Sequence, residues 1–146
     1  MWIDHEGRLG DSMAIEIEGI APLIFVFDMP ASVHFYRDVL GFELVNHAPE
    51  YAEGLFHWAM LRANGITLML NTAYDEGQAP EKPVPARVRA HGDTQFYFGC
   101  ADLQGAYQHL LAHGIKVMPP SVARYGFKQL QLKDPDGYHV CLQHPI

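Results

Sequence analysis

The stretch Lys133-Asp134-Pro135-Asp136-Gly137-Tyr138 contains the tight-turn dipeptide Asp-Gly, and it closes the second copy of a pattern that the chain carries twice. In each copy an aspartate precedes a helix-like stretch, a glycine ends that stretch, and a turn glycine introduces an apolar strand. The matching positions are Asp28 and Asp102, Gly41 and Gly114, and Gly65 and Gly137, at offsets of 74, 73 and 72 residues. This near-constant register indicates an internal duplication, and we expect two similar modules that face each other across a pseudo-two-fold axis with a shared groove.

Each copy is predicted to fold as β-α-β-β-β. The two aspartates are expected to cap the helices, and the two glycines that follow the helices are expected to end them. We expect strands at 16–27, 43–47, 56–62 and 66–71 in the first module, and at 115–118, 127–133 and 138–143 after the second helix, with Gln95 on the strand before that helix. Pro80, Pro83 and Pro85 fall between the copies, in a segment that is expected to be an exposed loop.

The composition indicates one globular domain, because 49% of the 146 residues are hydrophobic and 18% are charged. We place an N-terminal extension at 1–15 and the domain at 16–146, divided into module one (16–72), a linker (73–92) and module two (93–146). No apolar run approaches the roughly 18 residues that a membrane helix needs. The first twelve residues lack the basic start and apolar centre of a secretory signal.

The charge and the cysteines restrict the partners and the compartment. A net charge of −7 argues against nucleic acid as a partner, since nucleic-acid-binding proteins usually present a basic face. The two cysteines, Cys100 and Cys141, lie in predicted strands and are too few for a disulfide framework. We therefore expect a cytoplasmic protein with no membrane partner.

Two stretches, Phe35-Tyr36-Arg37-Asp38-Val39-Leu40-Gly41-Phe42 and Asp134-Pro135-Asp136-Gly137-Tyr138, carry a resemblance to a known family. Together with the paired modules, they make the chain from about 16 to 145 resemble the vicinal oxygen chelate superfamily of glyoxalases, bleomycin-resistance proteins and extradiol dioxygenases. The resemblance implies an α+β fold whose eight strands form a cup-like mixed sheet around a ligand site. It also implies a homodimer in which the neighbour often completes the site.

Enzymes of that family hold a divalent metal with one side chain from each of four strands. The resemblance places these four positions at Ala21, Met69, Gln95 and Cys141. Alanine offers no donor, methionine a weak thioether and glutamine a neutral carbonyl, so the usual metal site is expected to be absent and no cofactor is expected. The alternative is a displaced zinc or nickel site made by Gln95, His139 and Cys141, since residues two apart on a strand share a face.

Without a metal, the groove is expected to be an apolar and aromatic pocket with a few polar groups that orient a small, partly aromatic ligand. Strand alternation and the loop before 127–133 supply the candidates, which are Leu23, Phe25, Trp58, Met69, Gln95, Tyr97, Arg124, Tyr125, His139 and Cys141. The apolar members could instead fill a closed core. Asp134 and Asp136 are interpreted as turn residues rather than as catalytic acids.

Two classes of function remain. The first is a metal-free small-molecule-binding protein that resembles the bleomycin-resistance branch, with no catalytic residue. The second is a glyoxalase-like lyase or isomerase, or a dioxygenase-like enzyme, that uses the displaced metal or His139, Cys141 and Tyr97 as acid–base groups. A dimerisation or regulatory module with a filled groove is a third hypothesis. The missing metal donors favour the binding protein.

Overall fold

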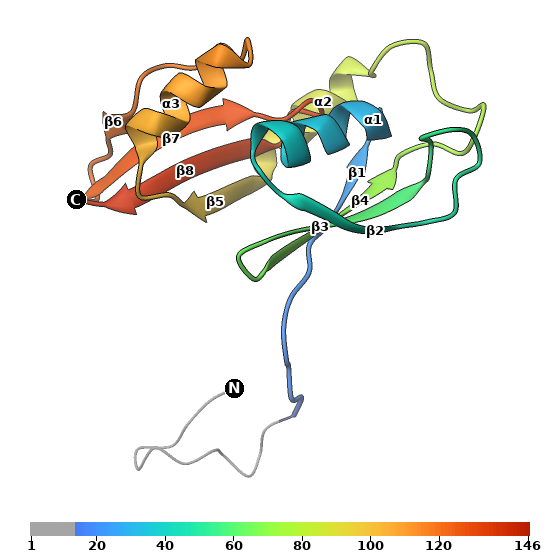
Figure 1. Cartoon of the computed structure of the whole chain (residues 1–146), viewed down its shortest axis with the longest axis horizontal. Coiled ribbons are helices and arrows are strands. Elements are labelled where there is room, and N and C mark those ends of the chain that lie inside the picture. The colour runs from blue at the N-terminus through green and yellow to red at the C-terminus, as the bar shows by residue number, and fades with distance from the viewer. Residues whose placement is uncertain (1–13) are drawn as a thin grey trace.

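A computed structural model describes residues 14–146, and its strands form two four-stranded mixed sheets (Figure 1). The first sheet has the order β1 (Leu23–Val26), β4 (Ile66–Thr72), β3 (Trp58–Ala63), β2 (Glu43–His47). The second has the order β5 (Gln95–Gly99), β8 (His139–Pro145), β7 (Phe127–Lys133), β6 (Ser121–Val122). In both sheets the first strand of the module pairs in parallel with the last, and the remaining pairs are antiparallel. The duplication and the α+β class are confirmed, and the eight strands are divided equally between the two sheets.

The helices begin and end as the sequence predicts. α1 (Met29–Val33) continues as the π-helical segment η1 (His34–Val39), and α3 (Leu103–Ala112) is the equivalent helix of the second module. The Asp28 and Asp102 side chains accept hydrogen bonds from the third residue after each of them, at 3.1 and 2.8 Å. Gly41 and Gly114 end the helices with φ values of +89° and +74°, which favour glycine.

One face of each sheet is covered by the helix of its own module, and the core lies between them (Figure 1). The strand residues that point towards the helices are buried, whereas the residues between them in sequence are more exposed. Fully buried members of this core include Val26, Tyr36, Leu61, Leu70, Leu110, Leu130 and Val140. The opposite face of each sheet, which we call the open face, carries no helix of the described chain.

The first strand is shorter than predicted, since β1 covers Leu23–Val26 rather than 16–27. Pro22 has no N–H to donate to a neighbouring strand, and β4 itself begins only three residues before Met69, the partner of Leu23. The segment 14–21 is therefore extended and exposed, and it leads away from the sheets (Figure 1). The predicted extension 1–15 lies almost entirely outside the described residues.

Three further predictions differ from the structure. The predicted strand at 115–118 is not assigned as a strand, and the short β6 follows two prolines at Pro119 and Pro120 instead. The linker is not all loop, because it contains α2 (Pro85–Ala90) and the 3-10 turn η2 (His91–Asp93). Cys100 lies directly after β5 rather than within it. Across residues 14–146, no helix is long and apolar enough to cross a membrane.

Candidate ligand-binding face

The open face of each sheet presents large apolar and aromatic side chains to solvent. Leu23 is 43%, Phe25 48% and Tyr97 51% exposed, although their neighbours Ile24 and Val26 are buried under α1. Strand alternation alone explains this division, because successive side chains point to opposite faces. In the described chain these three residues are therefore surface residues and do not fill a closed core.

On module one the open face carries mainly apolar side chains, with Asn71 among them. Phe25 on β1 pairs with Asn71 on β4, and Asn71 pairs in turn with Trp58 on β3. Leu23 and Met69 are likewise paired on β1 and β4, two residues along each strand from Phe25 and Asn71. Adjacent strands lie about 4.8 Å apart, so the predicted residues Leu23, Phe25, Trp58 and Met69 form one continuous surface. Trp58, whose orientation the sequence left open, belongs to this face.

On module two the open face is rich in amides and hydroxyls. The Tyr97 hydroxyl donates to Gln95 Oε1 at 2.8 Å. Gln129 Nε2 donates to the Tyr125 hydroxyl at 2.5 Å and to Gln143 Oε1 at 2.9 Å. The structure thus brings Tyr125 to the same face as Gln143, and it adds Gln129 on β7, which was not predicted from the sequence.

Arg124 is exposed, and no hydrogen bond or ion pair joins its side chain to the other candidates in residues 14–146. Tyr97 lies close to Tyr125, and partial desolvation together with this neighbour raises the pKa of Tyr97. Tyr97 is therefore a neutral phenol at physiological pH, able to donate one hydrogen bond and to accept others.

Cys141 is a poor nucleophile in this setting. Its side chain is 4% exposed, and burial raises the pKa of the thiol, which disfavours the reactive thiolate. Cys141 pairs across the sheet with Tyr97, whereas His139 pairs with Gln95. The His139 and Cys141 side chains share a face but belong to neighbouring rows of the sheet.

The residues present do not fit the divalent metal that the fold implies. Ala21 and Met69 bring no hard or borderline donor from module one. In module two, Gln95 Oε1 already accepts the Tyr97 hydroxyl, and Cys141 is a buried neutral thiol. No group of three or more His, Cys, Asp or Glu side chains within residues 14–146 is placed to hold a metal ion.

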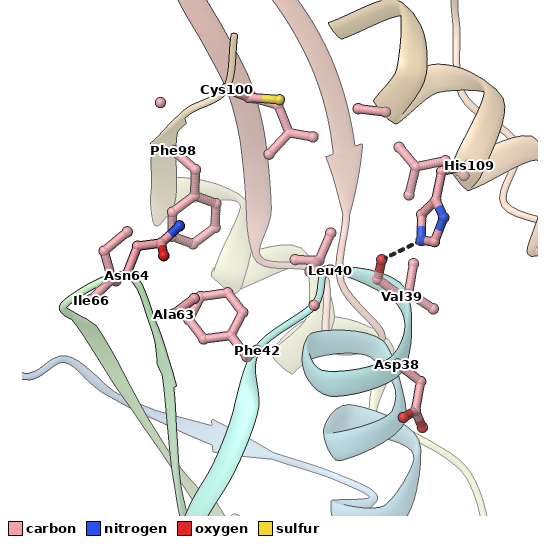
Figure 2. A pocket seen from close by; sticks show the side chains of 15 residues that line it. Asp38, Val39, Leu40, Phe42, Ala63, Asn64, Ile66, Phe98, Cys100 and His109 are labelled. Atoms are coloured by element: carbon pink, nitrogen blue, oxygen red, sulfur yellow. Dashed lines mark hydrogen bonds between the residues drawn. The ribbon is translucent and has the colours of Figure 1, made fainter. Parts of the chain in front are cut away.

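The open face is not a closed pocket in the single chain. A pocket of about 420 Å³ among the described residues is lined by η1, α3 and the helix-facing side of the strands (Figure 2). It therefore lies away from Phe25 and Tyr97. Enclosure of a ligand on the open face requires a further surface.

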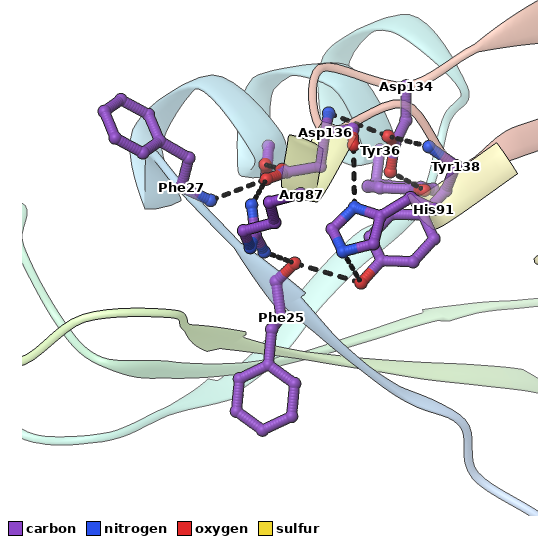
Figure 3. Close-up of polar contacts among 9 residues, drawn as sticks. Phe25, Phe27, Tyr36, Arg87, His91, Asp134, Asp136 and Tyr138 are labelled. Atoms are coloured by element: carbon purple, nitrogen blue, oxygen red, sulfur yellow. Dashed lines mark hydrogen bonds and ion pairs between the residues drawn. The ribbon is translucent and has the colours of Figure 1, made fainter. Parts of the chain in front are cut away.

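The turn between β7 and β8 docks against module one, and Asp136 is the centre of this contact (Figure 3). The Asp136 carboxylate is 1% exposed and accepts from the Phe27 amide at 2.7 Å and from the Ser32 hydroxyl at 3.3 Å. Arg87 on α2 donates to the same carboxylate at 2.8 Å. The interpretation of Asp136 as a turn residue alone was incomplete, because its partners lie in module one and in the linker.

Asp134 has a second role as well. Its Oδ1 accepts the backbone amides of Asp136 and Tyr138, as a turn residue does, whereas its Oδ2 accepts the Tyr36 hydroxyl at 2.6 Å. Burial and the adjacent carboxylate raise the pKa of Tyr36 far above its usual value, so Tyr36 remains a donor. Burial also raises the pKa of Asp134, against the effect of the hydrogen bonds that it accepts.

These contacts fix the backbone at Phe25. The Phe25 carbonyl accepts Arg87 Nη2 at 2.6 Å, and the Tyr138 hydroxyl lies 3.2 Å from the same oxygen. His91 stacks on Tyr138 with ring centroids 4.0 Å apart and donates through Nδ1 to the Asp136 carbonyl at 2.7 Å. We call this group the intermodule cluster, and it comprises Tyr36, Arg87, His91, Asp134, Asp136 and Tyr138.

Two paired β-α-β-β-β modules, each with a mixed four-stranded sheet and joined by the β7–β8 turn, define the fold class of this protein. The sequence model of the Glyoxalase/Bleomycin resistance protein/Dioxygenase superfamily matches residues 17–142. The chain therefore belongs to that superfamily. No curated protein matches it significantly in sequence.

Solved structures share this fold at low sequence identity. A glyoxalase/bleomycin resistance protein/dioxygenase from Nocardioides is 20% identical with a TM-score of 0.66, over 91% of this chain and 87% of that one. TnmS3, an antibiotic-binding protein from Streptomyces sp. CB03234, is 23% identical with a TM-score of 0.62, over 92% and 99%. A bleomycin resistance determinant encoded on transposon Tn5 is 19% identical with a TM-score of 0.62, over 88% and 98%.

Proposed function

We propose that the protein binds a small, partly aromatic molecule on the open face without the usual metal of its superfamily. The observation that carries this proposal is the exposure of Leu23 and Phe25 on the open face of module one and of Tyr97, which is bonded to Gln95, on the open face of module two. The open face of module one suits ring stacking, and the glutamine-rich open face of module two suits hydroxyl, carbonyl or amide groups of the ligand. The similar fold of an antibiotic-binding protein and of a bleomycin resistance determinant supports the same class.

We further propose that the protein is a homodimer and acts in the cytoplasm. A second copy would cover the exposed apolar residues of the open face and turn an open surface into an enclosed site. The cysteines are both free in the structure, in keeping with a reducing compartment.

The first experiment is a binding screen with a panel of aromatic antibiotics that includes bleomycin, followed by variants of the open face. Phe25→Ala and Tyr97→Ala are each expected to weaken binding of a ligand found in the screen by about tenfold, because truncated aromatic contacts in ligand sites cost roughly 1–2 kcal/mol. Calorimetric titration measures the affinity, and thermal unfolding checks that the variants fold.

Tyr51→Ala is the matched control, since Tyr51 is a partly exposed tyrosine that stacks on His57 beside a different pocket near the start of α1. Its affinity for the ligand is expected to equal that of the unmodified protein. Equal affinities for all three variants would place the ligand elsewhere and contradict the proposal.

Metal content gives an independent test. Elemental analysis of freshly purified, untagged protein is expected to find no stoichiometric divalent metal, and chelator treatment is expected to leave ligand affinity unchanged. The physical reason is the donor set, in which Ala21 and Met69 offer nothing that a hard or borderline cation prefers. One tightly held metal per chain would instead support an enzyme with a displaced site, and would overturn the metal-free proposal.

A further inference from the structure

The duplication allows the two junctions between the modules to be compared residue by residue. In the first junction the β7–β8 turn meets α1, and in the second the β3–β4 turn and α3 line one pocket. Strand register makes Asp134 equivalent to Ala63 and Tyr138 equivalent to Ile66, because Lys133 and His139 pair as Arg62 and Thr67 do. The helix offset of 74 residues makes Tyr36 equivalent to Leu110 and Ser32 equivalent to Ala106.

The first junction is filled. Tyr36 and Asp134 are joined by a hydrogen bond of 2.6 Å, and Ser32 and Asp136 by one of 3.3 Å. All four side chains are at most 5% exposed. The intermodule cluster therefore leaves no room for a guest between these elements.

The second junction carries smaller and apolar side chains at the same places. Ala63, Ile66, Ala106 and Leu110 stand where the first junction has Asp134, Tyr138, Ser32 and Tyr36, and all four line the pocket of about 420 Å³ (Figure 2). Two phenols, a carboxylate and a hydroxyl that fill the first junction are absent from the second. The pocket is thus the space that these groups would occupy, and its size lies within the range of small-molecule sites.

The walls of this pocket are held in place. His109 on α3 donates through Nε2 to the Val39 carbonyl on η1 at 2.8 Å, which joins the helices of the two modules. The rings of Phe42 and Phe98 meet edge to face with centroids 5.8 Å apart and form an aromatic wall. A site with a preformed shape loses less entropy when a ligand binds.

The chemistry of the lining selects an uncharged ligand. Asn64 contributes an amide that can donate and accept one hydrogen bond. The carboxylate of Asp38 at this pocket is already bonded to Arg37 and His34, each at 3.0 Å. An ionic guest would lose its hydration without a free counter-charge, and burial of an unpaired charge is costly.

We propose that this pocket is a second small-molecule site, which binds a neutral apolar molecule that contains a ring and carries one hydroxyl, carbonyl or amide group for Asn64. The site lies between η1 and α3 and is separate from the open face, so it does not depend on the function proposed above. The segment before β1 does not fill it in the structure. Ile15 and Ile17 in that segment are each 71% exposed and Ile20 is 88% exposed.

The test uses N-phenyl-1-naphthylamine, a neutral two-ring-system probe whose fluorescence rises in apolar surroundings. The unmodified full chain is expected to bind it, and Ala106→Phe, which fills the pocket, is expected to weaken binding by about tenfold or more. Ala112→Phe is the matched control, because Ala112 is an exposed residue of the same helix outside the pocket lining. Its probe affinity is expected to match that of the unmodified chain.

Cys100 provides a second readout, since it lines the pocket whereas Cys141 is 4% exposed. Bound probe is expected to slow labelling of Cys100 by a thiol reagent. If Ala106→Phe fails to fold, the pair Ala63→Asp with Leu110→Tyr rebuilds the polar contact of the first junction and is expected to abolish this protection.

Three results would overturn the proposal. The first is probe affinity that is unchanged in the filled variants, and the second is affinity that is lost in Phe25→Ala instead, which would place the probe on the open face. The third is a large gain in probe affinity and in Cys100 labelling when Ile15 and Ile17 are both changed to serine. That gain would show that the chain's own leading segment occupies the pocket in solution.

Discussion

Replacing Asp136 by alanine is expected to lower the free energy of unfolding by about 3–5 kcal/mol, the cost of removing one partner from a buried ion pair. The carboxylate is 1% exposed, and its loss leaves the Phe27 amide without its acceptor and the Arg87 guanidinium without its anionic partner. Buried donors that lose their acceptor keep the full cost of desolvation. Guanidinium denaturation followed by circular dichroism measures this loss.

Asp38→Ala is the control for this variant, because Asp38 also pairs with an arginine, at 3.0 Å, but on the exposed surface. Exposed ion pairs contribute little to stability, so the control is expected to unfold almost as the unmodified protein does. Similar denaturation midpoints for the two variants would mean that burial of Asp136 adds nothing to stability. The intermodule cluster would then not be what holds the two modules together.

Asp136→Ala is also expected to disturb the open face of module one, although Asp136 does not contact that face. Arg87 holds Asp136 with one nitrogen and the Phe25 carbonyl with the other, at 2.8 and 2.6 Å. Loss of the carboxylate frees the guanidinium and with it one restraint on β1. The cluster thus connects the turn of the second module to the placement of an aromatic side chain on the first.

Local sequence signals predicted the parts of the fold that depend on neighbouring residues. Asp28 and Asp102 act as helix caps, and Gly41 and Gly114 end their helices, because each of these roles needs only a few adjacent residues. Alternation along β1 and β5 also predicted which side chains leave the core. Alternation could not show that no other element packs on the open faces within the described chain, since that depends on how the two sheets are placed.

Interactions between distant residues were not predictable in the same way. Asp136 meets Phe27 and Ser32 across 109 and 104 positions of sequence, and Asp134 meets Tyr36 across 98. A turn such as Asp-Pro-Asp-Gly is a sufficient local reason for both carboxylates. Nothing in the sequence therefore indicated that either carboxylate also binds a residue of module one. Arg87 was missed for a related reason, because Pro80, Pro83 and Pro85 in the segment before it favoured a loop where α2 forms.

The pocket between η1 and α3 is the opposite case, because the sequence contained the signal. The duplication already aligns Tyr36 with Leu110 and Ser32 with Ala106. Smaller residues at equivalent positions indicate either closer packing or a void, and only the structure distinguishes the two. It shows a void of about 420 Å³ lined by Leu110 and Ala106.

Gly137→Ala is expected to destabilise the protein clearly more than Gly65→Ala, its equivalent in the first module. Both glycines have left-handed backbones, with φ of +87° and +82°, so any Cβ costs roughly 1–2 kcal/mol at either position. At Gly65 the new Cβ would meet no atom within 4 Å. At Gly137 it would lie 2.7 Å from the Val88 carbonyl oxygen and 2.8 Å from Val88 Cγ1.

That contact involves the backbone of α2, which cannot yield without moving Arg87 and its bonds to Asp136 and to the Phe25 carbonyl. Overpacking of this kind adds about 1–3 kcal/mol, so the two variants are expected to differ by that amount in denaturant unfolding. Ligand binding on the open face should fall in Gly137→Ala and persist in Gly65→Ala. Equal stabilities would mean that α2 shifts freely, in which case the linker does not hold β1 in place and the position of Phe25 is set by its own sheet.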